Sequence, residues 1–178
     1  MELHFVPECY FDTVLLKNIL GVRKVNHRQG CDNVINELEK GKRLKDDFAV
    51  ALIDNDKRKL KYIIEECITI NKTQNLLLLK HKDKKHYIVQ LVPAIERWVL
   101  KIIEEGQVDM EGLNLQADLN GLKEFTKYES ANESEELHRL CKRLINSNSH
   151  TMKTLIMWLT YLYKHNRNAD INILKENV

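Results

Sequence analysis

Three acidic residues follow apolar segments of the kind that form buried strands. Glu8 comes just after the segment 3–6. Asp54 and Asp56 come just after the segment 48–53. The carboxyl ends of parallel strands share one edge of a sheet, so the three carboxylates are expected to meet there. Crowded carboxylates repel one another, and a divalent cation relieves that repulsion. The spacing therefore predicts a site for Mg²⁺, a cation that prefers oxygen ligands.

The same acids also have ordinary structural explanations. Asp54, Asn55 and Asp56 form a common turn composition, and Asp56 is able to cap a following helix. Asp12 lies one turn into the helix predicted after Glu8, where the helix dipole favours a carboxylate. Both the turn and the metal site are open interpretations at this point. The coincidence of Glu8 with a second strand end favours the metal site.

Basic residues lie near the predicted acidic cluster. Three of them are consecutive and follow the second pair of acids: Lys57, Arg58 and Lys59. They are placed to hold a polyanion while the acids hold the metal, although one solvated helix face has the same composition. His27 and Arg28 follow another predicted strand, 22–26, and would contact phosphate if that strand ended at the same edge. A surface loop is the alternative for these two.

Strand and helix patterns alternate through the first hundred or so residues. Strands are predicted at residues 3–6, 22–26, 48–53, 76–79 and 87–92. Helices are predicted at 11–20, between Asp32 as its cap and Gly41 as its end, and at 60–67. This alternation predicts an α/β fold with a mostly parallel sheet flanked by helices. The short polar segment 82–85 permits a hairpin, which would make one edge antiparallel.

The remainder of the chain is predicted to be helical. Pro93 is expected to open a helix with a strongly apolar face, and no convincing strand follows Gly106. Helical periodicity then continues at 109–128, 133–145 and 152–163. The expected organisation is an α/β domain over residues 1–106, with a helical C-terminal extension over residues 107–178 packed on it.

The composition narrows the possible classes of protein. The 178 residues include 43% hydrophobic side chains, six glycines and two prolines, which is typical of a globular chain. The formal net charge of +2 is too small for a broad polyanion-binding surface, so nucleic-acid contact would need a local patch. No secretion signal is visible, and no apolar run reaches the roughly 18 to 20 residues that cross a membrane. A cytoplasmic protein without a membrane partner is expected.

Four short sequences resemble the Toprim domain over about the first hundred residues. ECYFD at 8–12 and IDND at 53–56 are similar to its strand ending in Glu-Gly-x-x-Asp and its later strand ending in Asp-x-Asp, with Cys9 in place of the glycine. GCDNV at 30–34 resembles the glycine-containing turn before the second helix. PAIERW at 93–98 resembles a segment of stand-alone Toprim proteins related to OLD-family nucleases and phage-defence components.

The resemblance implies specific roles for the acids. Toprim domains bind Mg²⁺ through them and make, break or rejoin phosphodiester bonds. Glu8, Asp54 and Asp56 would therefore be catalytic ligands of Mg²⁺ or Mn²⁺, supported by Asp12. Glu96 lies off the apolar face of its helix and is a further candidate ligand, although the first turn of a helix also favours glutamate. Glu8 would instead be a general acid or base if its neighbours raise its pKa.

Two functions follow from these expectations. The first is metal-dependent hydrolysis of DNA or RNA, in phage defence or nucleic-acid processing. The second is a Toprim-fold interaction module with little or no activity that partners a separate ATPase. Replacing Asp54 with alanine would abolish hydrolysis in the first case and preserve partner affinity in the second. The oligomeric state is not determined by the sequence.

Overall fold

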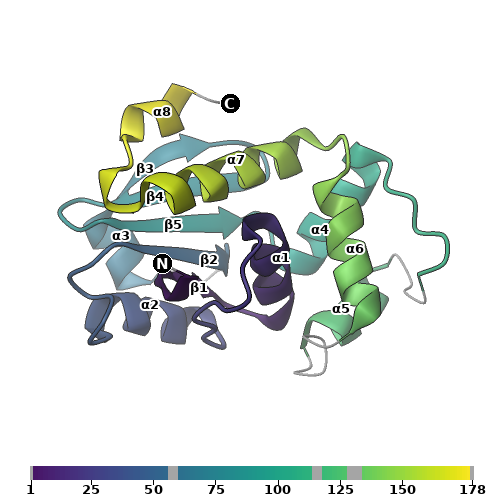
Figure 1. The fold of residues 1–178 in the computed structure, drawn as a ribbon, viewed down its shortest axis with the longest axis horizontal. Coiled ribbons are helices and arrows are strands. Elements are labelled where there is room, and N and C mark those ends of the chain that lie inside the picture. The colour runs from purple at the N-terminus through teal and green to yellow at the C-terminus, as the bar shows by residue number, and fades with distance from the viewer. Residues whose placement is uncertain (1, 56–59, 114–117, 128–133, 177–178) are drawn as a thin grey trace.

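A computed structural model describes residues 2–55, 60–113, 118–127 and 134–176 of the chain (Figure 1). Four residues of the predicted site lie outside these ranges: Asp56, Lys57, Arg58 and Lys59. Their predicted roles as a metal ligand and as a basic patch therefore stay predictions.

The described residues form one open, mixed sheet. Its strands are β1 (Phe5–Pro7), β2 (Ala49–Asp54), β3 (Cys67–Lys72), β4 (Leu76–His81) and β5 (His86–Leu91). They lie in the order β1-β2-β5-β4-β3. β1, β2 and β5 pair in parallel, whereas β4 is antiparallel to both β5 and β3. The predicted α/β class, the hairpin at residues 82–85 and the antiparallel edge are confirmed.

Helices cover both faces of this sheet (Figure 1). They are α1 (Tyr10–Leu20), α2 (Cys31–Lys40), α3 (Lys61–Glu66), α4 (Ile95–Gly106), α5 (Leu119–Lys127), α6 (Glu135–Ile145), α7 (His150–His165) and α8 (Ile171–Glu176). Successive residues of β2 point to opposite faces. Val50 and Leu52 lie in the core that includes α1, α4 and α7, while Ala51 and Ile53 lie in a smaller core with α2.

The C-terminal helices share the larger core with the sheet. Leu122 of α5, Leu140 of α6 and Leu155 of α7 are buried in the same cluster as Leu52 and Leu91. α5 packs against α1 and α4, and α6 and α7 pack against α1 and α4 as well. The C-terminal helices and the sheet therefore share one continuous core. Within the described ranges, no helix has the length and apolar character needed to cross a membrane.

Helix α1 begins and ends at residues with clear signals. The Cys9 Sγ accepts a hydrogen bond from the Asp12 N–H, and Asp12 in turn accepts one from the Cys9 N–H. This reciprocal cap satisfies two amides that the first turn cannot pair internally. Gly21 ends the helix with φ of 64°, a conformation that costs glycine little. The cap fixes Asp12 directly beside the end of β1.

Several predicted elements differ from the structure. The predicted strand 22–26 is not one of the strands of the sheet; its end lies beside β1, where the Asn26 N–H donates to the Phe5 carbonyl oxygen. Helix α3 ends at Glu66, and the β-branched residues of the segment 67–72 form an edge strand that was not predicted. Asp32 lies within the first turn of α2 rather than capping it. Pro93 precedes α4 rather than opening it, because the helix begins at Ile95 with Ala94 as its N-cap.

Candidate functional site

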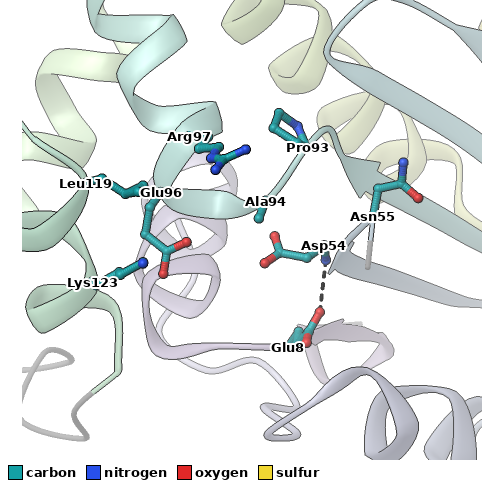
Figure 2. A pocket seen from close by; sticks show the side chains of 9 residues that line it. All are labelled: Glu8, Asp54, Asn55, Pro93, Ala94, Glu96, Arg97, Leu119 and Lys123. Atoms are coloured by element: carbon teal, nitrogen blue, oxygen red, sulfur yellow. Dashed lines mark hydrogen bonds between the residues drawn. The ribbon is translucent and has the colours of Figure 1, made fainter. Parts of the chain in front are cut away.

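A pocket of about 410 Å³ lies at the carboxyl ends of β1 and β2 (Figure 2). We call it the acid pocket, and its lining residues are Glu8, Asp54, Asn55, Pro93, Ala94, Glu96, Arg97, Leu119 and Lys123. The first three residues follow or end the two strands, and the next four belong to the β5–α4 connection and the start of α4. Helix α5 provides the last two. The strand-end rule predicted this edge of the sheet as the functional one.

Glu8 and Asp54 meet directly in the acid pocket although 46 residues separate them in sequence. The Asp54 N–H donates a hydrogen bond of 2.9 Å to the Glu8 Oε2 (Figure 2). The Glu8 N–H donates to the Leu52 carbonyl oxygen at 3.0 Å, which continues the pairing of β1 with β2. The parallel register of the two strands therefore brings both carboxylates to one place.

Asp12 lies behind these two acids with only 1% of its surface exposed. Its Oδ2 accepts from the Cys9 N–H at 3.3 Å, and its buried Oδ1 has no hydrogen-bond partner among the described residues. Burial raises the pKa of Asp12 well above its ordinary value, and the nearby charges of Asp54 and Glu8 raise it further. Three carboxyl groups are thus close enough to repel one another.

The opposite wall of the acid pocket adds residues of both charges. Glu96 lies half-buried in the first turn of α4, and Arg97 beside it is exposed. Lys123 reaches the pocket from α5, and its side chain and that of Glu96 point toward the same part of it (Figure 2). The predicted candidate Glu96 therefore lies at the pocket. Sequence reasoning missed both cations, although Arg97 had a visible signal in its place off the apolar face of α4.

His27 and Arg28 do not line the acid pocket. The Nδ1 of His27 lies 2.8 Å from the Thr13 hydroxyl, and its ring stacks on Tyr10 with 4.5 Å between ring centroids. The Nε of Arg28 donates to Glu37 of α2 at 3.0 Å. These contacts hold the segment after α1 against helices α1 and α2. Phosphate binding by them stays a prediction.

The donor set of the acid pocket is suited to a hard cation. Among the described residues, no three histidine, cysteine, aspartate or glutamate side chains are grouped closely enough to form a complete metal site. Mg²⁺ needs fewer protein ligands, because it commonly takes one or two carboxylates and completes its shell with water and phosphate oxygens. Glu8 and Asp54 supply two such carboxylates, and Asp12, whose Oδ1 has no hydrogen-bond partner among the described residues, is a third acid near enough to feel their charges. The residues present therefore fit the predicted ion.

Comparison with known proteins gave no relative: no family model matches the chain, and neither the curated proteins nor the solved structures include a significant match.

Proposed function

We propose that this protein is a metal-dependent nuclease of the Toprim type that hydrolyses phosphodiester bonds in DNA or RNA. One observation carries the proposal. The hydrogen bond from the Asp54 amide to Glu8 joins the two strand ends whose acids resemble the Toprim pattern, and it does so at a pocket. The role in phage defence or nucleic-acid processing rests on that resemblance alone.

Glu8 and Asp54 would hold Mg²⁺ or Mn²⁺ in this proposal, with Asp56 and Glu96 as further candidate ligands. When bound, the ion supplies positive charge to the scissile phosphate and lowers the pKa of a coordinated water. Asp12 would orient the two ligands from behind, since it is fixed by the α1 cap.

The protein's own cations would attract and orient the substrate. Arg97 and Lys123 lie across the acid pocket from Glu8 and Asp54. A phosphodiester between the two walls would contact the metal held by the acids on one side. On the other side it would contact the two cations. Guanidinium and ammonium groups at such positions bind phosphate oxygens directly.

The substitution Asp54→Asn tests the proposal, because it removes a charge and keeps the size of the side chain. Cleavage of labelled DNA and RNA in Mg²⁺ is expected to fall by at least about 100-fold, the order of loss for one essential catalytic group. Asp83→Asn in the exposed β4–β5 hairpin is the matched control and should cleave as the wild type does.

Calorimetric titration with Mg²⁺ provides a second readout. We expect weaker binding in Asp54→Asn and wild-type binding in Asp83→Asn. Full nuclease activity in Asp54→Asn would refute the proposed role of this acid. A wild-type protein with no cleavage, whose Asp54→Ala variant still binds an ATPase partner, would identify an interaction module instead.

A further inference from the structure

A second pocket, of about 560 Å³, lies on the same edge of the sheet. We call it the turn pocket, and its lining residues are Thr73, Gln74, Asn75, Lys101, Glu104, Glu105, His150 and Thr151. The end of β5 connects it to the acid pocket. The Asn55 N–H donates to the Leu91 carbonyl oxygen at 2.9 Å, and the next residue, Val92, donates its N–H to Asn75 at 3.0 Å. The two pockets therefore flank one short stretch of chain.

Helix α4 presents one cation to each pocket. Arg97 lines the acid pocket and Lys101 lines the turn pocket. Residues four apart lie on the same face of a helix, separated by about 6 Å along its axis. The opposite face is buried in the core through Trp98, Val99 and Ile102. The two cations thus form a short row along the open side of α4.

Lys101 is held in a defined position. Its Nζ donates to the Asn75 Oδ1 at 2.8 Å, and the Asn75 Nδ2 lies 3.3 Å from the Thr151 Oγ1. An ammonium group has three donors, so this contact leaves others for a ligand. A cation that is already ordered loses less conformational entropy when it binds an anion.

Two acids beside Lys101 differ in their surroundings. The Glu105 carboxylate accepts hydrogen bonds from the Ser149 hydroxyl and from the N–H groups of His150 and Thr151, at the start of α7. Burial alone would raise the pKa of Glu105, but these hydrogen bonds lower it. The charge of Glu105 is therefore balanced by the N-terminus of α7. Glu104 is exposed and opposes Lys101 in the attraction of an anion.

On the basis of the proposed function, we propose that the protein binds its nucleic acid as a single strand along the open face of α4. Arg97 contacts one phosphate and Lys101 the next, and the turn pocket receives the adjoining nucleotide. Its hydroxyl and amide side chains can hydrogen-bond to sugar and base edges.

The size and charge of the surface favour one strand over a duplex. The two pockets are in the size range of small-molecule sites, suited to single nucleotides. The cations form one row on one helix, as in grooves that follow a single backbone. A duplex presents two backbones, and the net charge of +2 leaves no broad basic surface for the second.

Binding measured in EDTA tests this path separately from catalysis. Fluorescence anisotropy would compare a short labelled DNA strand, the same RNA strand and the DNA duplex. The wild type should bind the single strands more tightly than the duplex. Lys101→Gln should weaken single-strand binding by about tenfold at low salt and reduce the salt dependence by the equivalent of about one phosphate contact. Lys142→Gln on the exposed side of α6 is the matched control and should have little effect.

Glu104→Gln is the complementary variant, because it removes the opposing charge beside Lys101. It should tighten single-strand binding severalfold, a gain that misfolding cannot produce. Equal affinity for strand and duplex, no binding by the wild type, or equal effects of Lys101→Gln and Lys142→Gln would each overturn the inference. If the wild type binds single strands in a Lys101-dependent way but does not cleave them, the nuclease proposal is refuted and the binding inference stands.

Discussion

The two edges of the sheet hold aspartates in opposite surroundings. At the amino edge, Asp47 accepts two hydrogen bonds from Arg167, at 2.6 and 2.5 Å, and one from the Phe48 N–H. The Arg167 side chain lowers the pKa of Asp47 to about 2. At the carboxyl edge, burial and the charge of Asp54 raise the pKa of Asp12. Hydrogen-bond donors balance the charge of Asp47. Asp12 is instead repelled by neighbouring acids, and a bound cation would relieve that repulsion.

A buried histidine at the amino edge also has a hydrogen-bond partner for each of its ring nitrogens. The Nε2 of His86 donates to the Leu44 carbonyl oxygen at 2.8 Å, and its Nδ1 accepts from the Tyr62 hydroxyl at 2.5 Å. Burial lowers the pKa of His86 to about 4. Polar groups at this edge are paired with one another, whereas Asp12 at the carboxyl edge keeps one buried oxygen without a hydrogen-bond partner among the described residues. Both groups are buried, so it is their partners that distinguish the two edges.

The largest effect on stability is expected from His86→Ala. The change leaves a cavity and removes both hydrogen bonds, so the free energy of unfolding should fall by about 3 kcal/mol. The proposed nuclease activity, if measured on the folded fraction, should be unchanged, because His86 lies at the other edge of the sheet. Denaturant titration measures the loss, and His165→Ala at the exposed end of α7 is the control.

The pH dependence of unfolding gives an independent check on His86. Its folded pKa of about 4 lies below the ordinary 6.5, so the unfolded chain takes up the proton first as the pH falls. The stabilisation is complete above pH 6.5 and is lost progressively toward pH 4, by about 3 kcal/mol. His86→Ala should flatten this part of the profile. An unchanged profile would show that His86 is not the titrating group.

A smaller effect, of opposite sign, is expected from Asp12→Asn. The raised pKa means that the stability contributed by protonated Asp12 is present below its ordinary 3.8 and lost as the pH rises through the folded value. The amide removes the repulsion at neutral pH, so the free energy of unfolding there should be higher than that of the wild type. The gain should vanish in acid.

Cleavage by Asp12→Asn separates the functional from the structural interpretation. A more stable protein with reduced Mg²⁺-dependent cleavage would agree with a carboxylate kept for ligand placement. If Asp12→Asn were less stable than the wild type at neutral pH, Asp12 would not be repelled by its neighbours and the contrast with Asp47 would fail.

The smallest effect is expected from Asp47→Asn. Its partner Arg167 is exposed, and solvent and salt weaken such pairs. The loss of stability should be below that of His86→Ala and should shrink further in high salt. Measurements of the unfolding midpoint at two salt concentrations would check this, with Asp46→Asn as a neighbouring exposed control. A loss that is large and independent of salt would show that the pair matters more than its exposure suggests.

The acids of the candidate site were predictable from local patterns, whereas Lys123 was not. Glu8 and Asp54 follow apolar strands, so the rule that parallel strands end at one edge suffices to bring them together. Lys123 reaches the acid pocket because α5 packs against α4 and α1, and no local pattern in the sequence indicates this tertiary packing. The strand 67–72 was missed for a related reason: its outer residues are polar or exposed, and pairing with β4 determines its conformation.

The extended segment after α1 has a consequence for assembly. The Asn26 N–H donates to the Phe5 carbonyl oxygen, and the Arg28 N–H donates to that of Pro7. These bonds occupy acceptors on the outer side of β1, which a neighbouring molecule would need in order to add a strand. A second copy of the chain cannot extend the sheet at β1 without displacing the segment. Sheet-to-sheet polymerisation is therefore blocked at that border by the chain itself.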